Sequence, residues 1–486
     1  MNELRKKMKV LFASAEAAPF AKVGGLGDVS GALPASLLQN YPDELDIRTI
    51  LPFHEAIKKL DPPMKKIGDY AFSVNDQELV CQLFVSDIDG VPVYLVDNDY
   101  LNHNSPVYHG DWYLDGLKYA TFSLALLEAL RYLDWEIDIL HANDWHTALA
   151  PHALKTTYLN DPFFQGIKTI LSIHNLPYNG WGSQDAMTRL GYVPSHDQDL
   201  PDWARFTPLP LGVASADKVI TVSPGYAREI LTPEYGCGME GYLQKHSDKV
   251  MGILNGIDVN IWDPETDEQI SHNFSADAFS ERVNNKLDLQ KALDFEVDEN
   301  IPLLTIVSRL SDQKGIPAIL EALPQLLERD WQFVLLGSGS PELEQAANQF
   351  AAAHPNRIAC ILKYDEVIAH VLYASGDIFL MPSLYEPCGL SQMFSMRYGN
   401  LPVATETGGL FDSIIDFSSD PENATGFLYK EKSAQGLLNS LNLALDIFAE
   451  PGTWHKLQKN AMKADFAWKT SAAQYFDVYK SLLGKM

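Results

Sequence analysis

Short apolar runs alternate with longer amphipathic stretches along this chain, and this alternation constrains the fold more than any other feature. In the first half the runs lie at 10–13, 91–96, 137–141, 169–173 and 218–222. Apolar strands interleaved with helical patterns are typical of parallel sheets covered by helices on both faces. The pattern begins again at 303–307, 333–336, 358–361, 378–381 and 401–404. The sequence therefore predicts an α/β protein with two doubly wound domains.

Chain length also indicates two domains, because 486 residues exceed what one hydrophobic core usually serves. The segment 255–267 is rich in turn-forming residues, among them Gly256, Asp258 and Pro264. We therefore predict a first domain over 1–256, a connection over 257–285 and a second domain over 286–462. Aromatic and apolar residues recur at helical intervals over 463–483, which predicts a terminal helix over 463–486.

Charge and cysteine content exclude several classes of protein. The chain has 37 basic and 64 acidic residues, a formal net charge of −27, which argues against nucleic-acid and anionic-membrane partners. No window approaches the roughly 18 apolar residues of a membrane helix, and the N-terminal basic cluster does not lead into a secretory signal. Four scattered cysteines fit neither a disulfide framework nor a zinc site. We expect a soluble, cytoplasmic protein.

A glycine-rich loop follows the first apolar run. It includes Lys22, Gly24 and Gly25 within 22–29, and a helical pattern follows it. Glycines let the backbone approach a ligand, N–H groups at a helix start favour an anion, and Lys22 adds a positive charge. The alternative is a tight turn with a surface lysine, since the loop has neither P-loop nor dinucleotide spacing.

Polar residues also follow the runs at 137–141 and 169–173. The first group contains Asp144 and His146, and the second contains His174. Ligands of open α/β sheets bind beyond the carboxyl ends of the strands, which favours a binding site here. A helix-capping role for Asp144 and a structural role for His174 are the alternatives.

In the second domain, Arg309 and Lys314 follow the run at 303–307. A planar guanidinium and a mobile ammonium suit a diphosphate, although a solvated surface pair is the alternative. The Gly-x-Gly at 337–339 has Glu342 where the third glycine of a dinucleotide fingerprint would stand, so a nicotinamide or flavin site is disfavoured.

The most specific element of the sequence is the stretch 382–392. Its core is Glu386-Pro387-Cys388-Gly389-Leu390. Proline fixes the chain just after an acid, and glycine lets the backbone turn its N–H groups toward a ligand. The alternative is an acid that merely stabilises a helix N-terminus. A further glycine turn, Thr407-Gly408-Gly409, follows the run at 401–404.

Together these loops resemble the bacterial glycogen synthase and plant starch synthase family, retaining glucosyltransferases with two Rossmann-like domains facing across a cleft (the GT-B fold). The resemblance runs from Lys9 to about Leu483. The motifs that carry it are Lys22-Val-Gly-Gly-Leu-Gly-Asp-Val, His141-Ala-Asn-Asp-Trp-His, Ile173-His-Asn-Leu, Thr221-Val-Ser-Pro, Asn255-Gly-Ile-Asp, Ser308-Arg-Leu through Gln313-Lys-Gly, Glu386-Pro-Cys-Gly-Leu and Thr407-Gly-Gly-Leu. The resemblance implies that the terminal helix returns to the first domain.

The resemblance also implies a reaction and roles for single residues. Glucose would pass from ADP-glucose or UDP-glucose, between which the sequence does not choose, to an α-1,4-glucan such as glycogen or a maltooligosaccharide. Glu386, His174, Asp144 and Lys22 would be the catalytic residues, and His146 and Asn255 would orient sugar hydroxyls. The reaction would need no metal and no cofactor. Donor-binding positions would be Lys22, Gly24, Gly25, Arg309, Lys314, Tyr364, Cys388, Gly389, Leu390, Thr407, Gly408 and Gly409.

Two departures from the family pattern lie on the acceptor side. The segment 98–118 is only loosely similar, and 208–213 replaces a stretch that usually contains lysine. Related retaining enzymes carry a second glutamate eight positions after the first, where this chain has Phe394. The alternatives are a phosphorylase-like enzyme that uses pyridoxal phosphate and a non-catalytic glucan-binding scaffold on the same fold.

Overall fold

The computed structural model describes residues 7–101 and 104–484, and its contacts divide the chain into two compact units. Unit 1 comprises Met1–Gly256 together with Trp468–Met486, and unit 2 comprises Ile257–Ala467. Each unit has its own β-sheet and its own hydrophobic core. The predicted boundaries of the connection at 257–285 stay a prediction.

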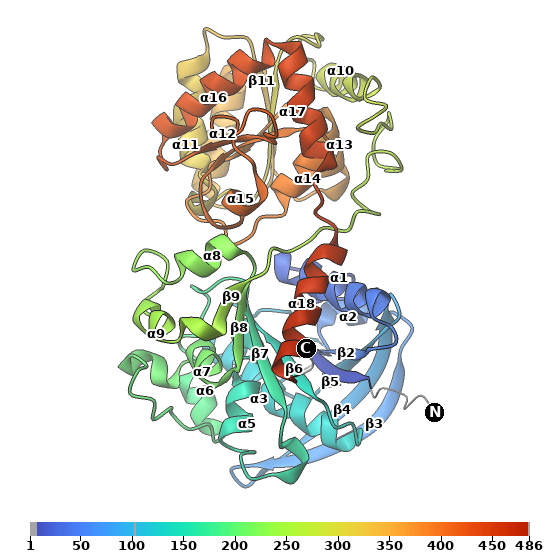
Figure 1. Cartoon of the computed structure of the whole chain (residues 1–486), viewed down its shortest axis with the longest axis vertical. Coiled ribbons are helices and arrows are strands. Elements are labelled where there is room, and N and C mark those ends of the chain that lie inside the picture. Colours follow the sequence, from blue (N-terminus) through green and yellow to red (C-terminus); the bar gives the residue numbers. More distant parts are fainter. Residues whose placement is uncertain (1–6, 102–103, 485–486) are drawn as a thin grey trace. The chain divides into compact units, whose positions relative to one another are not determined.

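Unit 1 contains a nine-stranded sheet in the order β3-β4-β5-β2-β1-β6-β7-β8-β9 (Figure 1). Strands β3, β4 and β5 pair antiparallel and the remaining neighbours pair parallel. The strands are β1 (Met8–Ala13), β2 (Leu45–Pro52), β3 (Lys65–Val74), β4 (Gln77–Ile88), β5 (Val91–Asp97), β6 (Ile139–Asn143), β7 (Lys168–Ile173), β8 (Lys218–Thr221) and β9 (Val250–Gly252).

Helices cover both faces of this sheet because successive side chains of a buried strand point to opposite sides. In β1, Val10 and Phe12 face one core, and Leu11 and Ala13 face the other. The helices of this part of unit 1 are α1 (Gly25–Asn40), α2 (Glu55–Leu60), α3 (Trp112–Tyr132), α4 (Asp144–Thr147), α5 (Leu149–Lys155), α6 (Gln184–Arg189), α7 (Pro208–Ser215), α8 (Pro224–Glu229) and α9 (Glu240–Lys245).

The last helix, α18 (Trp468–Leu482), belongs to unit 1 and packs against α1. Phe476 of α18 stacks on Tyr41 with 3.7 Å between ring centroids, and Tyr479 is fully buried. The Tyr479 hydroxyl lies 2.8 Å from Nδ1 of His141 in β6. The helix therefore forms part of the first core, which confirms the predicted return of the terminal helix.

Unit 2 contains a six-stranded parallel sheet in the order β12-β11-β10-β13-β14-β15. Its strands are β10 (Leu303–Val307), β11 (Gln332–Leu336), β12 (Ile358–Ile361), β13 (Ile378–Met381), β14 (Leu401–Thr405) and β15 (Phe427–Tyr429). Its helices are α10 (Arg282–Ala292), α11 (Ile316–Ala322), α12 (Pro341–Ala353), α13 (Glu366–Ser375), α14 (Ser391–Arg397), α15 (Gly408–Ser413), α16 (Ala434–Phe448) and α17 (Pro451–Lys463). One continuous core joins sheet and helices.

Two α/β sheets of doubly wound type confirm the predicted fold class. The terminal helix was predicted to begin near Lys463, and this start is wrong. Residue 463 ends α17, Ala464 is extended, and Ala467 forms a β-bridge with Ile257 before α18 begins at Trp468. The predicted range therefore includes the last residue of α17 and a short extended segment before α18.

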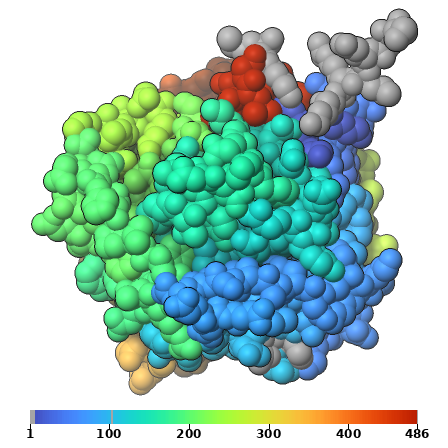
Figure 2. Space-filling model, turned by 90° about the horizontal axis from the view of Figure 1, so that it is seen from below, coloured from blue at the N-terminus to red at the C-terminus, as the bar shows by residue number. Residues whose placement is uncertain are grey.

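The surface of unit 1 combines segments from three parts of the sequence. In Figure 2 blue, teal and green parts of the sequence lie side by side on this face. Beneath the surface, the largely buried helix α3 contacts both β3 and α6. Among residues 7–101 and 104–484, no helix is both long enough and apolar enough to cross a bilayer.

Candidate active site

Glu16, just beyond β1, holds the glycine-rich loop in place. One carboxylate oxygen accepts hydrogen bonds from the backbone N–H groups of Val23, at 2.6 Å, and Gly24, at 3.0 Å. The other oxygen accepts a hydrogen bond from the Tyr108 hydroxyl. A single buried acid therefore fixes the start of the loop and connects it to the segment before α3.

The loop ends in an open helix start. Helix α1 begins at Gly25, and a Cβ atom built on Gly24 or Gly25 would meet nothing within 4 Å. The Lys22 ammonium lies 2.7 Å from the Asp28 carboxylate, with both side chains about one-third exposed. Open space above N–H groups at a helix start, beside a lysine, suits an anionic ligand group.

Asp144 and His174 meet where the parallel strands β6 and β7 end. The Asp144 carboxylate accepts a hydrogen bond from the His174 backbone N–H at 2.7 Å, and His174 Nε2 lies 3.0 Å from the Asn143 side-chain oxygen. Asp144 adopts a φ of 53°, in the left-handed region that aspartate and asparagine enter more readily than other non-glycine residues. The structure thus brings together two of the predicted catalytic residues.

His146 lies beside them on α4 and is buried by aromatic rings. Its ring centroid is 4.6 Å from that of Tyr119 and 5.1 Å from that of Tyr108. Its Nδ1 has no hydrogen-bond partner within residues 7–101 and 104–484. A buried unpaired ring nitrogen is costly unless a ligand or water satisfies it, so His146 suits a hydroxyl-binding role.

Lys118 is a further buried side chain of unit 1. Its ammonium lies 3.0 Å from His54 Nδ1 and donates hydrogen bonds to the carbonyls of Pro106, at 2.5 Å, and Val107, at 3.2 Å. It thereby fixes the segment that carries Tyr108. Residues 106–118 of the divergent segment are therefore fixed beside the candidate site by these contacts.

Burial sets the charge state of these groups. Loss of solvation raises the pKa of Asp144 to about 7, hydrogen bonds from His174 and Asn175 oppose the shift, and the Glu16 carboxylate adds to it. Burial also raises the pKa of Glu16, against its hydrogen bonds from Tyr108, Val23 and Gly24. For His146 and His174 burial lowers the pKa, to about 3 and about 4. Both histidines are therefore neutral at pH 7 and suited to hydrogen bonding with sugar hydroxyls.

In unit 2, Lys314 and Glu386 form an ion pair of 2.6 Å. The Ser383 hydroxyl donates a second hydrogen bond to the same Glu386 oxygen at 3.0 Å. Their loops are joined because the Leu384 N–H donates to the Gln313 carbonyl and Gly315, at φ 70°, lies against Pro382. The ends of β10 and β13 thus hold two predicted site residues together.

The glycine turns of unit 2 lie against each other. The Gly409 N–H donates to the Glu386 carbonyl at 3.0 Å, and a Cβ on Gly409 would lie 2.1 Å from the Cys388 carbonyl oxygen. Gly389 and Gly408 have φ values of 73° and 44°. Thr407 precedes α15 and Leu390 precedes α14. The predicted positions 386, 388–390 and 407–409 therefore form one cluster.

Three other residues named by the resemblance lie outside this close packing. Tyr364 is 76% exposed. Arg309 is exposed, and its side chain makes no ion pair or hydrogen bond within the part of the chain that the structure describes. In unit 1, Asn255 is buried, with a side-chain oxygen that lacks a hydrogen-bond partner among the described residues.

Phe394 occupies the position of the second glutamate of related enzymes. Its ring stacks on Trp262 with 4.0 Å between centroids, so this position carries an aromatic packing role. Within the described ranges no group of three or more His, Cys, Asp or Glu side chains could hold a metal ion.

Residues 9–245 match the family described as the starch synthase catalytic domain, and residues 290–463 match the family described as glycosyl transferases group 1. The glycogen synthase of Streptococcus pneumoniae (strain 70585) is 39% identical over 481 residues, which cover 98% of this chain and all of that protein. The chain belongs to the glycogen and starch synthase family. The glycogen synthase of Streptococcus mutans is also 39% identical, over 487 residues that cover 98% of this chain and all of the relative.

Solved structures agree with this membership. The catalytic domain of starch synthase IV from Arabidopsis thaliana, solved with ADP and acarbose, has a TM-score of 0.88 and 30% identity, covering 99% of this chain and all of that one. Sucrose-phosphate synthase from Thermosynechococcus elongatus shares the fold, with a TM-score of 0.61 and 19% identity. The predicted glycogen synthase-type glucosyltransferase with the GT-B fold is thereby confirmed.

Four residues of the candidate site were not predicted from the sequence, namely Glu16, Tyr108, Lys118 and Ser383. Glu16 and Ser383 each lie within three residues of a strand end, which is the signal that could have found them. Tyr108 and Lys118 lie in the divergent segment, where no local pattern marks them.

Proposed function

We propose that the chain transfers the glucosyl group of ADP-glucose to the non-reducing end of an α-1,4-glucan, with retention of anomeric configuration. The observation that carries the proposal is the Lys314–Glu386 ion pair, with Ser383 on the same carboxylate oxygen. In the proposal Lys314 binds the diphosphate and Glu386 contacts the glucose, and the ion pair between them supports these neighbouring roles. Membership of the glycogen and starch synthase family supplies the acceptor class.

Support for the adenine nucleotide comes from the starch synthase IV structure, which is described as bound to ADP and acarbose. In our proposal Arg309 and Lys314 bind the diphosphate, and the exposed ring of Tyr364 packs on the nucleobase. The glycine turn at 388–390 supplies backbone N–H groups, and the turn at 407–409 supports it from behind through the hydrogen bond from the Gly409 N–H to the Glu386 carbonyl. Their positive φ values support a close approach of ligand to backbone.

The residues of unit 1 receive complementary roles. Lys22, Gly24 and Gly25 bind phosphate oxygens at the open start of α1. Asp144, His146 and Asn255 bind glucose hydroxyls, and the backbone carbonyl of His174 faces the reacting carbon. The unpaired His146 and Asn255 acceptors support this assignment.

The proposed reaction is a same-face substitution. The bond between the anomeric carbon and the β-phosphate oxygen breaks while the acceptor hydroxyl forms the new glycosidic bond on that face. The hydroxyl proton passes to the departing phosphate oxygen. Positive charges near the phosphate stabilise the charge that develops there. We propose the cytoplasm as location, supported by four cysteines that are all free.

The test is chain extension of glycogen and of maltoheptaose with ADP-glucose or UDP-glucose supplied separately. Wild-type protein is expected to extend both acceptors from ADP-glucose. Glu386→Gln is expected to lower kcat by about 10²–10³, the usual effect of removing a group that stabilises the transition state, with little change in Tm. Glu328→Gln, an exposed acid of the same unit, is the matched control and should keep full activity. Extension by Glu386→Gln at the wild-type rate would contradict the role, and extension from neither donor would contradict the function.

A further inference from the structure

Residues 262–267, which we call the anchor segment, precede α10 in unit 2 and pack on α13 and α14. The Trp262 ring lies between two other rings. Its centroid is 3.9 Å from that of His370 in α13 and 4.0 Å from that of Phe394 in α14. The interplanar angles are 10° and 22°, so the three rings form a stack. One side chain of the anchor segment therefore joins two helices of unit 2.

Asp267, at the other end of the anchor segment, is a buried carboxylate. One of its oxygens lies 2.7 Å from His370 Nδ1 and accepts a hydrogen bond from the Tyr398 hydroxyl at 2.5 Å. The other oxygen accepts a hydrogen bond from the Gln269 N–H at 2.8 Å. Burial acts to raise the pKa of Asp267, but its hydrogen bonds, first that with His370, hold the pKa below the ordinary value. The carboxylate is therefore charged at pH 7, although only 6% of the residue is exposed.

The anchor segment contacts one face of α14. Phe394, Arg397 and Tyr398 are spaced three and four residues apart, so they lie on the same side of the helix and its end. The Arg397 guanidinium pairs with the Asp263 carboxylate at 3.0 Å and donates to the Trp262 carbonyl at 3.4 Å. All three residues of this face are thus bound by residues of the anchor segment.

The other end of α14 carries the turn that we propose to bind the donor. The helix begins at Ser391, directly after the turn at 386–390. The Gln392 side chain donates hydrogen bonds to the carbonyls of Cys388, at 3.2 Å, and Gly389, at 2.9 Å. The turn is therefore bonded to the first residues of the helix. Since α14 has only seven residues, a shift at its far end is passed to the turn about 10 Å away.

Core packing alone would not require a charged group at Asp267. A buried charge adds little to stability compared with apolar side chains of similar size, because its loss of hydration offsets the attraction to its partners. A satisfied network of buried polar groups instead favours one arrangement of the elements that it joins. The network around Asp267 joins the anchor segment to α13 and to the end of α14, and it thereby selects one position for α14.

We propose that Trp262 and Asp267 are positioning residues for the donor. They fix α14, and α14 fixes the turn at 386–390 against the diphosphate and the glucose. Neither side chain needs to touch the donor, because the effect passes through the helix. This inference rests on the proposed function for the identity of the donor.

The test measures ADP binding and steady-state kinetics of the full chain. Asp267→Asn, which removes the charge and keeps the shape, is expected to raise the dissociation constant of ADP and the KM for ADP-glucose about tenfold or more, since a displacement of about 1 Å can cost as much as a hundredfold. The KM for glycogen should stay unchanged. Trp262→Ala should have the same effects, and Trp262→Phe, which keeps a flat ring in the stack, should restore most of the affinity.

Hydrogen exchange provides a second readout that needs no ligand. The backbone N–H groups of residues 386–397 should exchange faster in Asp267→Asn than in the wild type, because the turn and the helix open more easily. Tyr398→Phe removes one hydroxyl only and should show the same change at smaller size. This variant keeps the test available if Asp267→Asn does not fold.

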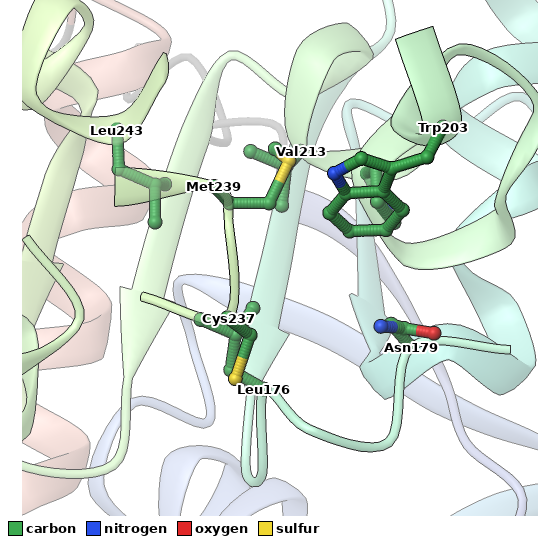
Figure 3. A pocket seen from close by; sticks show the side chains of 8 residues that line it. Leu176, Asn179, Trp203, Val213, Cys237, Met239 and Leu243 are labelled. Atoms are coloured by element: carbon green, nitrogen blue, oxygen red, sulfur yellow. The ribbon is translucent and has the colours of Figure 1, made fainter. Parts of the chain in front are cut away.

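Two controls separate positioning from loss of stability. Trp331 is buried just before β11, at the edge of the sheet opposite the turn, and Trp331→Phe should lower Tm without changing ADP affinity. Met239 of unit 1 is buried and lines a small, mostly apolar pocket with Trp203 and Leu243 (Figure 3). Met239→Ala should likewise lower Tm and leave ADP affinity unchanged.

Unchanged ADP affinity in Asp267→Asn would overturn the proposal, and so would unchanged exchange of residues 386–397 or an equal loss of affinity in Trp331→Phe. Faster exchange in Asp267→Asn, together with a wild-type chain that neither binds ADP nor extends glucan, would instead contradict only the proposed function.

Discussion

At the residue scale, Glu16 does most to shape the candidate site residues of unit 1. Its carboxylate joins the backbone of Val23 and Gly24 to the hydroxyl of Tyr108. The positions of Lys22 and of the open start of α1 therefore depend on one acid in the loop between β1 and α1. Its effect on the reaction is indirect, through the backbone it holds.

We predict that Glu16→Gln lowers kcat/KM for the donor about tenfold. The glutamine side chain has one acceptor oxygen in place of two and carries no charge. The hydrogen bonds from the N–H groups of Val23 and Gly24 should therefore weaken by about 1–2 kcal/mol. Steady-state kinetics with varied ADP-glucose checks this. Glu55→Gln, which breaks only an exposed i,i+4 pair with Lys59, should leave kcat/KM unchanged. Equal losses in both variants would contradict the role of Glu16.

Asp144 gives a prediction about pH. Burial raises its folded pKa to about 7, above the ordinary value of 3.8. Between these values the folded protein binds more protons than the unfolded chain, so Asp144 lowers the free energy of unfolding as pH rises from about 4 to 7. Relative to Asp144→Asn, the wild type should lose on the order of 2–4 kcal/mol between pH 4 and pH 8, at about 1.4 kcal/mol per pKa unit. Urea unfolding of both proteins across this range provides the measurement, and a constant difference would refute the shift.

Several site residues were predictable from the sequence because they stand in motifs at strand ends, as Asp144, His174 and Glu386 do. Glu16 could not be predicted, because a single acid two residues before a proline-containing turn belongs to no recognisable motif. Tyr108 and Lys118 act through contacts with residues far away in sequence, such as Glu16 and His54. Such pairings are decided by tertiary packing, which local patterns do not contain.

At the element scale, helix α1 and the segment before the glycine loop touch through a glycine. A Cβ on Gly31 would lie 2.4 Å from the Ala18 carbonyl oxygen, and the Ala18 N–H donates to the Gly27 carbonyl at 2.9 Å. The helix and the segment can approach this closely only because residue 31 has no side chain. The orientation of α1 beneath the loop is thereby fixed.

We predict that Gly31→Ala destabilises the protein by about 1–3 kcal/mol, the usual cost of overpacking, because backbone must move to admit the methyl group. It should also lower activity by displacing the start of α1. Gly241→Ala is the matched control, since that helical glycine has nothing within 4 Å of an added Cβ, and it should be neutral or stabilising by up to about 1 kcal/mol. Thermal unfolding distinguishes them, and equal Tm values would contradict the close contact.

Strands buried on both faces were predictable, whereas half-exposed ones were not. The runs at β10 to β14 match the structure within one residue. Strands β3 and β4 were missed because their side chains alternate between buried and exposed, and β2 because Asp46 and Arg48 interrupt its apolar run. The run predicted at 137–141 lies two residues earlier than β6, since Ile137 precedes the point where pairing with β1 begins.

At the scale of the whole molecule, the two units differ in the number of chain segments that form them. Unit 2 is one continuous segment, Ile257–Ala467, with its own core. Unit 1 needs two segments, because α18 contributes large buried side chains to its core. These are Trp468, Tyr475, Phe476, Val478 and Tyr479.

We predict that residues 257–467 expressed alone unfold cooperatively, whereas a chain ending at residue 467 loses more than about 5 kcal/mol in unit 1. Burial of each large apolar side chain contributes about 1.5–3 kcal/mol, and five are removed together. Calorimetry of the full chain, the fragment and the truncated chain provides the comparison. A peptide of residues 463–484 added to the truncated chain should raise the lower transition. A truncated chain with the wild-type transition would show that α18 is dispensable.

Because α18 belongs to unit 1 but follows unit 2 in the sequence, unit 2 can complete its core before unit 1 does during synthesis. Residues 7–256 emerge first, yet their core lacks the side chains of α18 until residues 468–482 have been synthesised. The later segment 257–467 can complete its own core earlier, since domains fold as their residues become available. Until then the apolar cluster around Val10, Phe12 and Ile139 is covered by α1 but not by α18. Chaperone demand should therefore be greatest during synthesis of the second unit.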